Sequence, residues 1–459
     1  MAVVLGTLLV TLTVFVVGAE WGGPVLLRWA IPPLMIAVIA LLAVVVPASR
    51  RIFVWVALAL TAVQIAVHDD WMAQTVHGLS VAAFVAAFFS ALTTLRHAAQ
   101  TSPAIAACGR FLANQPPGRR YAALSVGGQL FSLLLNYGAI ALLGSLAASS
   151  AREEKDPEIR AVRMRRMLLA IQRALVATLP WSPLSFAVAI STSLLPGTSW
   201  STLVLPSFVS GLLLVGIGYA LDTIFKPRVT RAAPRPPSEE GWGALRPLVL
   251  LLVTLFSLVA TLQILTGVRT VGVVASVVPF VSAGWVAAQA KRGNRIRYLR
   301  ERALNYMRRD LLAYRGEITL LSMAAYIGTV GSTLVAEWLA SIGTDLSQVP
   351  AGVILVALVW VFTFAGQVAM NPILTASMIL PLLPTAAAMG VSPTSIQVAV
   401  TAGWALSGAN SPFTATTLIT GSFAGTSPWT VGLRWNGLYS ILCGTALSVW
   451  VLVYAFALS

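Results

Sequence analysis

An interrupted apolar segment that occurs twice is the feature that most constrains how this chain can fold. Residues 180–200 read PWSPLSFAVAISTSLLPGTSW, and residues 409–429 read ANSPFTATTLITGSFAGTSPW. The matching positions are Ser182-Pro183 with Ser411-Pro412, and Trp200 with Trp429. Corresponding interrupted apolar segments in two halves of a membrane chain are typical of secondary transporters with internal symmetry.

The sequence before each copy also repeats. An Ile-Gln pair precedes each segment, and a Gly-Gln pair lies further upstream in an apolar stretch. These pairs are Ile171-Gln172 and Gly128-Gln129 in the first half, and Ile396-Gln397 and Gly366-Gln367 in the second. The similarity therefore extends over whole halves of the chain.

The composition is that of a protein buried in a membrane. The chain is 58% hydrophobic and only 10% charged, whereas about a quarter of the residues in a soluble domain are charged. Apolar stretches long enough to span a bilayer recur along its whole length. The fold class predicted is therefore an all-α polytopic membrane protein. Two cysteines, Cys108 and Cys443, exclude a disulfide framework or a cysteine-rich metal site.

The net charge of +15 is confined to one set of loops. The basic loops are Arg50-Arg51, Arg96 to Arg120, Arg152 to Arg166, Lys226 to Arg246 and Lys291 to Arg315. The alternate loops carry Glu20, Asp69-Asp70 and Asp345, with Arg269 as the basic exception. This asymmetry predicts that the basic loops are cytoplasmic and contact bilayer lipid, and it argues against nucleic acid as a partner. We expect a plasma membrane protein (the inner membrane of a bacterium), with its N-terminus cytoplasmic and its C-terminus external.

About eleven transmembrane helices and two re-entrant hairpins, in two inverted-topology repeats, satisfy this charge rule. The apolar segment 121–148 lies between two basic loops, so we expect it to enter and return as a cytoplasmic hairpin that turns near Asn136-Tyr137-Gly138. An external hairpin is expected at 351–388. The predicted divisions are an extra first helix at 1–20, a first repeat at 21–225, a cytoplasmic linker at 226–246 and a second repeat at 247–459.

Spans 5 (about 167–195) and 10 (about 396–424) are predicted to be broken, because prolines remove backbone donors and disfavour helix before them. A helix broken within the membrane offers donors to anions and acceptors to cations. Together with the hairpin tips, the breaks should form one site. The predicted substrate contacts are Asn136, Tyr137, Gly138, Ser182, Asn371, Pro372, Asn410, Ser411, Thr414 and Thr417, with Thr416 nearby. The predicted ion ligands are Asn136, Asn371, Thr375, Asn410 and Ser411.

Few ionisable residues fall inside the predicted spans. Arg173 lies about two turns into span 5, where it either faces an anion or extends back to the cytoplasmic surface. Arg434 and Glu337 lie near span ends and are expected at the interface. The breaks contain no acidic residue, which favours Na⁺ coupling or exchange over a titrating proton site; no other cofactor is expected.

The whole plan resembles the ion transporter superfamily, and most closely its divalent anion/sodium symporter branch. The best local match is MNPILTASMILPLLPTAAAMGVSP at 370–393, where Asn371 falls on the asparagine of the branch's Ser-Asn-Thr hairpin motif. Met370 and Pro372 stand in place of the flanking Ser and Thr. The resemblance implies a carboxylate-type substrate, a homodimer and an elevator-type motion.

Other functions stay open. A proton-coupled or uncoupled exporter or exchanger of another organic or metalloid anion is the main alternative. A channel would need the same apolar framework without an occluding site. A membrane-embedded enzyme would need a catalytic or metal cluster, yet the histidines, at 68, 77 and 97, lie near span ends without ligand spacing.

Overall fold

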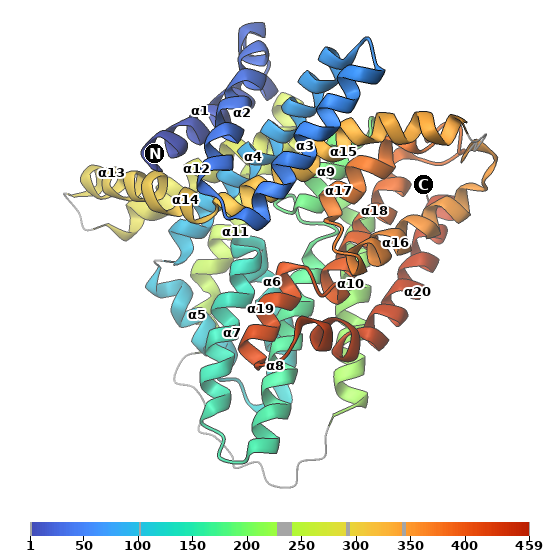
Figure 1. Ribbon diagram of the computed structural model, residues 1–459. Coiled ribbons are helices and arrows are strands. Elements are labelled where there is room, and N and C mark those ends of the chain that lie inside the picture. The colour runs from blue at the N-terminus through green and yellow to red at the C-terminus, as the bar shows by residue number, and fades with distance from the viewer. Residues whose placement is uncertain (1, 101, 227–240, 291–293, 342–345, 459) are drawn as a thin grey trace. The chain divides into compact units, whose positions relative to one another are not determined.

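The computed structural model describes residues 2–100, 102–226, 241–290, 294–341 and 346–458. Most of the predicted linker 226–246 lies outside these residues. Within them, nine helices are long and apolar enough to cross a membrane, and the chain is a polytopic helical protein (Figure 1). Two compact units result from the packing, and each takes elements from both halves of the sequence.

Unit 1 comprises residues 1–98, 257–348 and 373–384. Its helices are α1 (Ala2–Glu20), α2 (Val25–Val45), α3 (Ala48–Val67), α4 (Trp71–Gln100), α12 (Thr270–Gln289), α13 (Arg295–Asn305), the π-helical η2 (Tyr306–Asp310), α14 (Leu311–Ala313), α15 (Arg315–Ser341), η3 (Leu346–Gln348), α17 (Pro372–Ile379) and η4 (Leu380–Leu382). α11 (Arg246–Thr266) supplies residues to both units.

Unit 2 comprises residues 99–256, 349–372 and 385–459. Its helices are α5 (Pro103–Ala113), α6 (Pro117–Leu135), α7 (Tyr137–Arg152), α8 (Pro157–Thr178), α9 (Phe186–Leu194), α10 (Trp200–Ile224), η1 (Trp242–Leu245), α16 (Ala351–Gln367), α18 (Pro393–Asn410), α19 (Ala415–Ala424), the π-helical η5 (Thr430–Trp435), α20 (Gly437–Val453) and η6 (Tyr454–Leu458).

Exposed apolar side chains on α3 show why this fold needs lipid. The helix carries large hydrophobic residues that unit 1 leaves more than 40% exposed, a pattern that water would strongly disfavour. These include Ile52, Trp55, Leu58 and Val63. In contrast, every residue of α18 from Thr394 to Asn410 is buried, so α18 is the core helix of unit 2.

The predicted breaks fall where the prolines and glycines place them. Span 5 is α8 followed by α9, span 10 is α18 followed by α19, and segment 121–148 is the α6–α7 pair, which changes direction at Asn136. Segment 351–388 is less symmetric, because α16 belongs to unit 2 and most of the short α17 belongs to unit 1. Helix breaking is thus confirmed, whereas re-entry into a membrane stays a prediction.

The basic exception on the predicted outer side has a partner. The guanidinium of Arg269 donates to the carboxylate of Glu20, with Nε 3.0 Å from Oε2. Because the pair is neutral, Arg269 does not disturb the charge asymmetry between the two sets of loops.

Candidate functional site

Two buried glutamines connect the two copies of the repeat. On α8, the side-chain amide of Gln172 donates to the carbonyl of Ala409 at the end of α18, at 3.1 Å. On α18, the amide of Gln397 donates to Ser191 Oγ at 3.1 Å and Thr192 Oγ1 at 2.7 Å on α9. Both glutamines are fully buried. Each copy therefore supplies a hydrogen-bond donor to the broken helix of the other copy.

The first helix of the first hairpin packs closely against the helix that precedes the first break. α6 and α8 run parallel, and a Cβ on Gly128 would lie 2.8 Å from the Cβ of Ala174, so the two backbones touch there (Figure 1). Asn136 is eight residues beyond Gly128 (136 − 128), and Ser182 is eight beyond Ala174 (182 − 174). Both residues lie just beyond the ends of these helices, because α6 ends at Leu135 and α8 at Thr178.

The second copy repeats this close approach. A Cβ on Gly366 of α16 would lie 2.5 Å from Ser407 Oγ and 2.9 Å from Ser411 Cβ on α18. The hydroxyl of Ser411 donates to the Gly366 carbonyl at 2.6 Å. Three residues after Gly366, Ala369 has a φ of 64°, and Asn136 at the first tip has a φ of 50°. Both tips thus hold a non-glycine residue at positive φ, a strained conformation that is common at functional sites.

Most of the hydroxyl side chains predicted as ligands form hydrogen bonds with backbone groups of their own break. The hydroxyl of Thr417 donates to the Ser411 carbonyl at 2.6 Å, Thr414 donates to the same carbonyl at 2.9 Å, and Thr416 donates to the Gly408 carbonyl. At the first break, Ser182 Oγ accepts from the backbone N–H of Leu184 at 3.2 Å. These side chains stabilise the breaks because they form hydrogen bonds with backbone groups that a continuous helix would pair.

Three amide oxygens near helix ends in unit 2 remain as buried acceptors. Asn136 Oδ1, Gln367 Oε1 and Gln397 Oε1 are buried and have no hydrogen-bond partner within the described ranges. The amide nitrogen of Gln367 donates to Asn410 Oδ1 at 3.1 Å, so Asn410 is already engaged. A buried acceptor without a partner is costly, and a cation or an N–H donor would relieve that cost.

Arg173 is held inside unit 2 by a dense set of contacts. Its Nε donates to Asn436 Oδ1 at 3.0 Å, its Nη1 to the Tyr121 hydroxyl at 3.3 Å, and its Nη2 to the Trp435 carbonyl at 3.3 Å. The guanidinium also lies over the ring of Tyr439, 4.3 Å from its centroid. With 7% of the residue exposed, Arg173 does not extend to the surface.

Asn436 joins this arginine to the crossing helices. It is fully buried, and its amide donates to Gln172 Oε1 at 3.0 Å and to the Val431 carbonyl at 3.1 Å. A continuous polar chain therefore runs from Arg173 through Asn436 and Gln172 to Ala409 at the second break. Two side chains, Asn436 and Gln172, thus connect the arginine to the break.

A cavity of about 380 Å³ opens beside Arg173. It is formed by the start of α6, by α8 between Val162 and Arg173, by the end of α10 and by the η5–α20 junction. The first three segments adjoin loops that the charge rule places on the cytoplasmic side. Its lining is Tyr121, Val162, Arg165, Arg166, Leu169, Arg173, Leu221, Asp222, Phe225, Arg434, Trp435, Leu438 and Tyr439.

Positive charge dominates this cavity. Four arginines against one aspartate leave a net charge of +3 (4 − 1) in its lining. Asp222 is committed to Arg166, with Oδ1 2.8 Å from Nε and Oδ2 2.6 Å from Nη2. The cavity can therefore attract a small anion.

The remaining predicted residues are spread more widely. Tyr137, Gly138, Asn371 and Pro372 lie at the ends of the hairpin helices in unit 2, whereas Thr375 is buried on α17 in unit 1. Sequence reasoning missed Gln172, Gln397 and Asn436 as structural centres of the site. Their signal was present, because glutamine and asparagine in an apolar span are costly and usually bonded to another helix.

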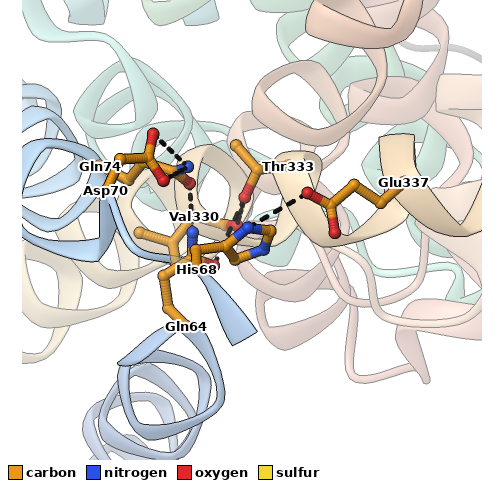
Figure 2. A network of polar contacts seen from close by, with 7 residues as sticks. All are labelled: Gln64, His68, Asp70, Gln74, Val330, Thr333 and Glu337. Carbon is orange, nitrogen blue, oxygen red and sulfur yellow. Dashed lines mark hydrogen bonds and ion pairs between the residues drawn. The ribbon is translucent and has the colours of Figure 1, made fainter. Parts of the chain in front are cut away.

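Unit 1 contains a separate polar network at the ends of α3, α4 and α15 (Figure 2). His68 Nδ1 lies 3.1 Å from Glu337 Oε1. The buried Gln64 donates to Gln74 Oε1, and Gln74 Nε2 lies 2.8 Å from Asp70 Oδ1. The sequence predicts His68 and Glu337 near span ends and Asp70 in a loop, and the structure brings the three into one network. The network ties three helices of this unit.

Solved structures of two transporters resemble this chain. The Alcanivorax borkumensis YdaH transporter aligns over 88% of this chain and 98% of its own, with 16% identity and a TM-score of 0.53. Neisseria gonorrhoeae MtrF, described among antimetabolite efflux pumps, aligns over 90% and 96%, with 14% identity and a TM-score of 0.57. No known protein family matches the sequence, and no curated protein does either. The likenesses show a shared fold, without selecting the divalent anion/sodium symporter branch.

Proposed function

We propose that this protein is a secondary transporter that moves a small organic anion of the carboxylate type across the membrane. The observation that carries the proposal is the cavity with a net charge of +3 beside Arg173. Arg173 is aligned by Asn436, Trp435 and Tyr439, and a guanidinium held in one orientation suits planar carboxylate recognition. The shared fold with two transporters supports the same function.

Anion binding would compete with the contacts that Arg173 makes now. A carboxylate that took the Nη1 and Nη2 donors would release Tyr121 and the Trp435 carbonyl. Trp435 belongs to the π-helical η5, and π-helical turns are frequent at functional sites. The polar chain through Asn436 and Gln172 would then carry the change to the second break. An elevator-type motion, in a homodimer, is the alternating-access scheme that we propose for this fold.

Sodium is the coupling ion that we propose. The unpaired oxygens of Asn136, Gln367 and Gln397 are neutral acceptors of a kind that can ligate Na⁺. Transport should then rise with external sodium and depend on Asn410 and Ser411, which hold Gln367 and Gly366 in place. Transport by purified protein that ignores sodium but follows an imposed pH gradient would contradict sodium coupling.

Export is the second candidate. The cavity lies on the side predicted to be cytoplasmic, which suits loading of an anion from inside the cell, and MtrF is described as an antimetabolite efflux pump. A proton-coupled exporter would need a titrating carboxylate, and Asp222, paired with Arg166 in the cavity lining, is the first residue to test.

A proteoliposome assay tests the proposal. Purified protein is reconstituted, and uptake of labelled organic acids and oxyanions is measured with sodium, proton or no gradients, in both directions. Arg173→Gln should reduce transport at least about thirtyfold, because truncating a buried charged partner costs roughly 2 kcal/mol or more. Arg173→Lys should retain part of the activity, and Arg152→Gln, on an exposed arginine at the end of α7, should retain all of it.

A binding measurement separates folding from function. The native protein should show a thermal shift with a transported anion, and Arg173→Gln should lose this shift while keeping its own unfolding transition. Saturable exchange distinguishes a transporter from a channel. Full transport by Arg173→Gln would refute the assignment of the cavity.

A further inference from the structure

α13 is a basic helix that the protein itself does not cover. It spans Arg295–Asn305 with the sequence RIRYLRERALN, and none of its residues is buried. Within unit 1 it packs only lightly, against the end of α12 and the following η2 (Figure 1). A helix without buried side chains gains little from packing, so another surface is needed to explain its amphipathic sequence.

Three apolar residues of α13 share one face. Ile296, Leu299 and Ala303 are spaced i, i+3 and i+7, which places them on one stripe of a helix. Ile296 is 85% exposed, an unusual state for a large aliphatic side chain in water. Arg295 and Arg300 flank this stripe. The arrangement is that of a helix lying in a membrane interface, with apolar residues toward the acyl chains and arginines at the headgroups.

Two of the arginines on α13 carry charge that the described parts of the protein do not neutralise. Arg297 is paired with Glu301 at 2.9 Å. Arg302 donates to the Tyr298 hydroxyl from Nη2 at 3.1 Å. Arg295 and Arg300 are exposed and have no ion-pair partner in the described ranges. Their charges remain available to an anionic surface.

The segment after α13 fixes the orientation of the helix. Tyr306 is buried, and its hydroxyl bonds Thr93 Oγ1 at 2.8 Å on α4. The backbone of Met307 is in direct contact with α1, because a Cβ on Gly6 would overlap the Met307 carbonyl oxygen. α13 therefore continues rigidly into a turn that is anchored in unit 1, and its apolar stripe cannot rotate freely.

The position of α13 in the chain keeps it at the membrane surface. It lies between α12 (Thr270–Gln289) and α15 (Arg315–Ser341), both long and apolar enough to span. The 11 residues of α13 extend about 16 Å at 1.5 Å per residue, so the helix cannot leave the interface by much.

We propose that α13 lies in the plane of the membrane surface and binds anionic phospholipid headgroups through Arg295 and Arg300. Ile296, Leu299 and Ala303 insert at the boundary between headgroups and acyl chains. This site is separate from the cavity in unit 2 and does not depend on the transported substrate.

Fluorescence quenching in vesicles tests the proposal. In full-length protein with Cys108 and Cys443 replaced by alanine, Ile296→Cys or Asn305→Cys is labelled with an environment-sensitive dye. Asn305 is exposed and nine residues further on, two and a half turns away, so it samples the opposite face. Vesicles contain phosphatidylcholine with or without phosphatidylglycerol, and a nitroxide on either lipid serves as quencher.

We expect quenching at position 296 and little at position 305. In mixed vesicles, nitroxide-labelled phosphatidylglycerol should quench more strongly than nitroxide-labelled phosphatidylcholine. Replacing both Arg295 and Arg300 with glutamine should reduce this preference by about fivefold per arginine, since each basic residue near an anionic surface contributes about 1 kcal/mol. The double change Arg152→Gln/Lys155→Gln removes the same charge elsewhere and should leave the preference intact.

Three results would contradict the proposed lipid site on α13. Equal quenching at positions 296 and 305, or a water-exposed label at 296, would show that α13 does not lie on the membrane. Equal quenching by the two lipids in the native protein would show membrane contact without headgroup selection. A preference unchanged by the arginine replacements would place the lipid site elsewhere.

Discussion

The amide of Gln172 on α8 bonds the carbonyl of Ala409 on α18 at 3.1 Å, joining two residues that are 237 positions apart. The carbonyl lies at the end of a core helix, where the next turn cannot pair every backbone acceptor. The Gln172 side chain, from the first copy, thus pairs a backbone carbonyl at the second break. Its own oxygen accepts a hydrogen bond from Asn436. Hydrogen bonds from two glutamines thus join the two sequence copies within unit 2.

Removing this connection should destabilise unit 2. Gln172→Ala would leave the Ala409 carbonyl and the Asn436 amide without that partner, at about 1–3 kcal/mol for each buried group. We expect a lower unfolding temperature and reduced transport. Gln263→Ala, on the half-buried face of α11, is the control and should behave like the native protein. An unchanged unfolding temperature for Gln172→Ala would mean that the hydrogen bond contributes nothing.

Asn136 can be separated into its backbone and side-chain roles. Its φ of 50° favours glycine, so Asn136→Gly relieves strain while it removes the buried amide. We expect a folded protein with an equal or higher unfolding temperature and transport reduced about tenfold or more, the cost of a lost buried polar partner. Asn371→Ala should weaken transport in the same way.

Ala369→Gly is the matched control for Asn136→Gly, because it relaxes a φ of 64° at the other tip without removing a polar group. It should keep its transport activity. Normal transport kinetics in Asn136→Gly would mean that this asparagine only shapes the turn.

Gly366 is predicted to be intolerant of any side chain. The Cβ of Gly366→Ala would lie 2.5 Å from Ser407 Oγ and would force α16 away from α18. We expect a loss of about 1–3 kcal/mol in stability, measured by thermal unfolding in detergent. Gly331→Ala, on α15 with nothing within 4 Å, should be neutral or stabilising by up to about 1 kcal/mol. Equal behaviour of the two variants would contradict the close contact of the helices.

The hairpin topology can be tested by cysteine labelling from outside. Ser150 is unsuitable as a probe, since it is buried and accepts a hydrogen bond from Arg163 at 2.7 Å. Lys155→Cys and Arg300→Cys are exposed positions in two basic loops and should both resist a membrane-impermeant thiol reagent. Asp69→Cys should react. Labelling of position 155 alone would mean that 121–148 crosses the membrane once.

The sequence by itself determined where two of the long apolar helices break. Prolines remove backbone donors and glycines permit close packing, so the breaks after α8 and α18 follow from local chemistry. The change of direction at Asn136 and the sorting of basic residues into one set of loops are equally local. Each of these features depends on residues that are neighbours in the chain.

Only the tertiary structure decided which polar groups meet. The predicted hydroxyls mostly cap their own breaks, while Gln172, Gln397 and Asn436 link the copies. From the sequence, Arg173 could either face an anion or extend to the cytoplasmic surface. In the structure it packs against Tyr439 beside the cavity. A buried polar group must find a partner, but which partner it finds depends on how distant helices pack. That choice is a property of the folded chain as a whole.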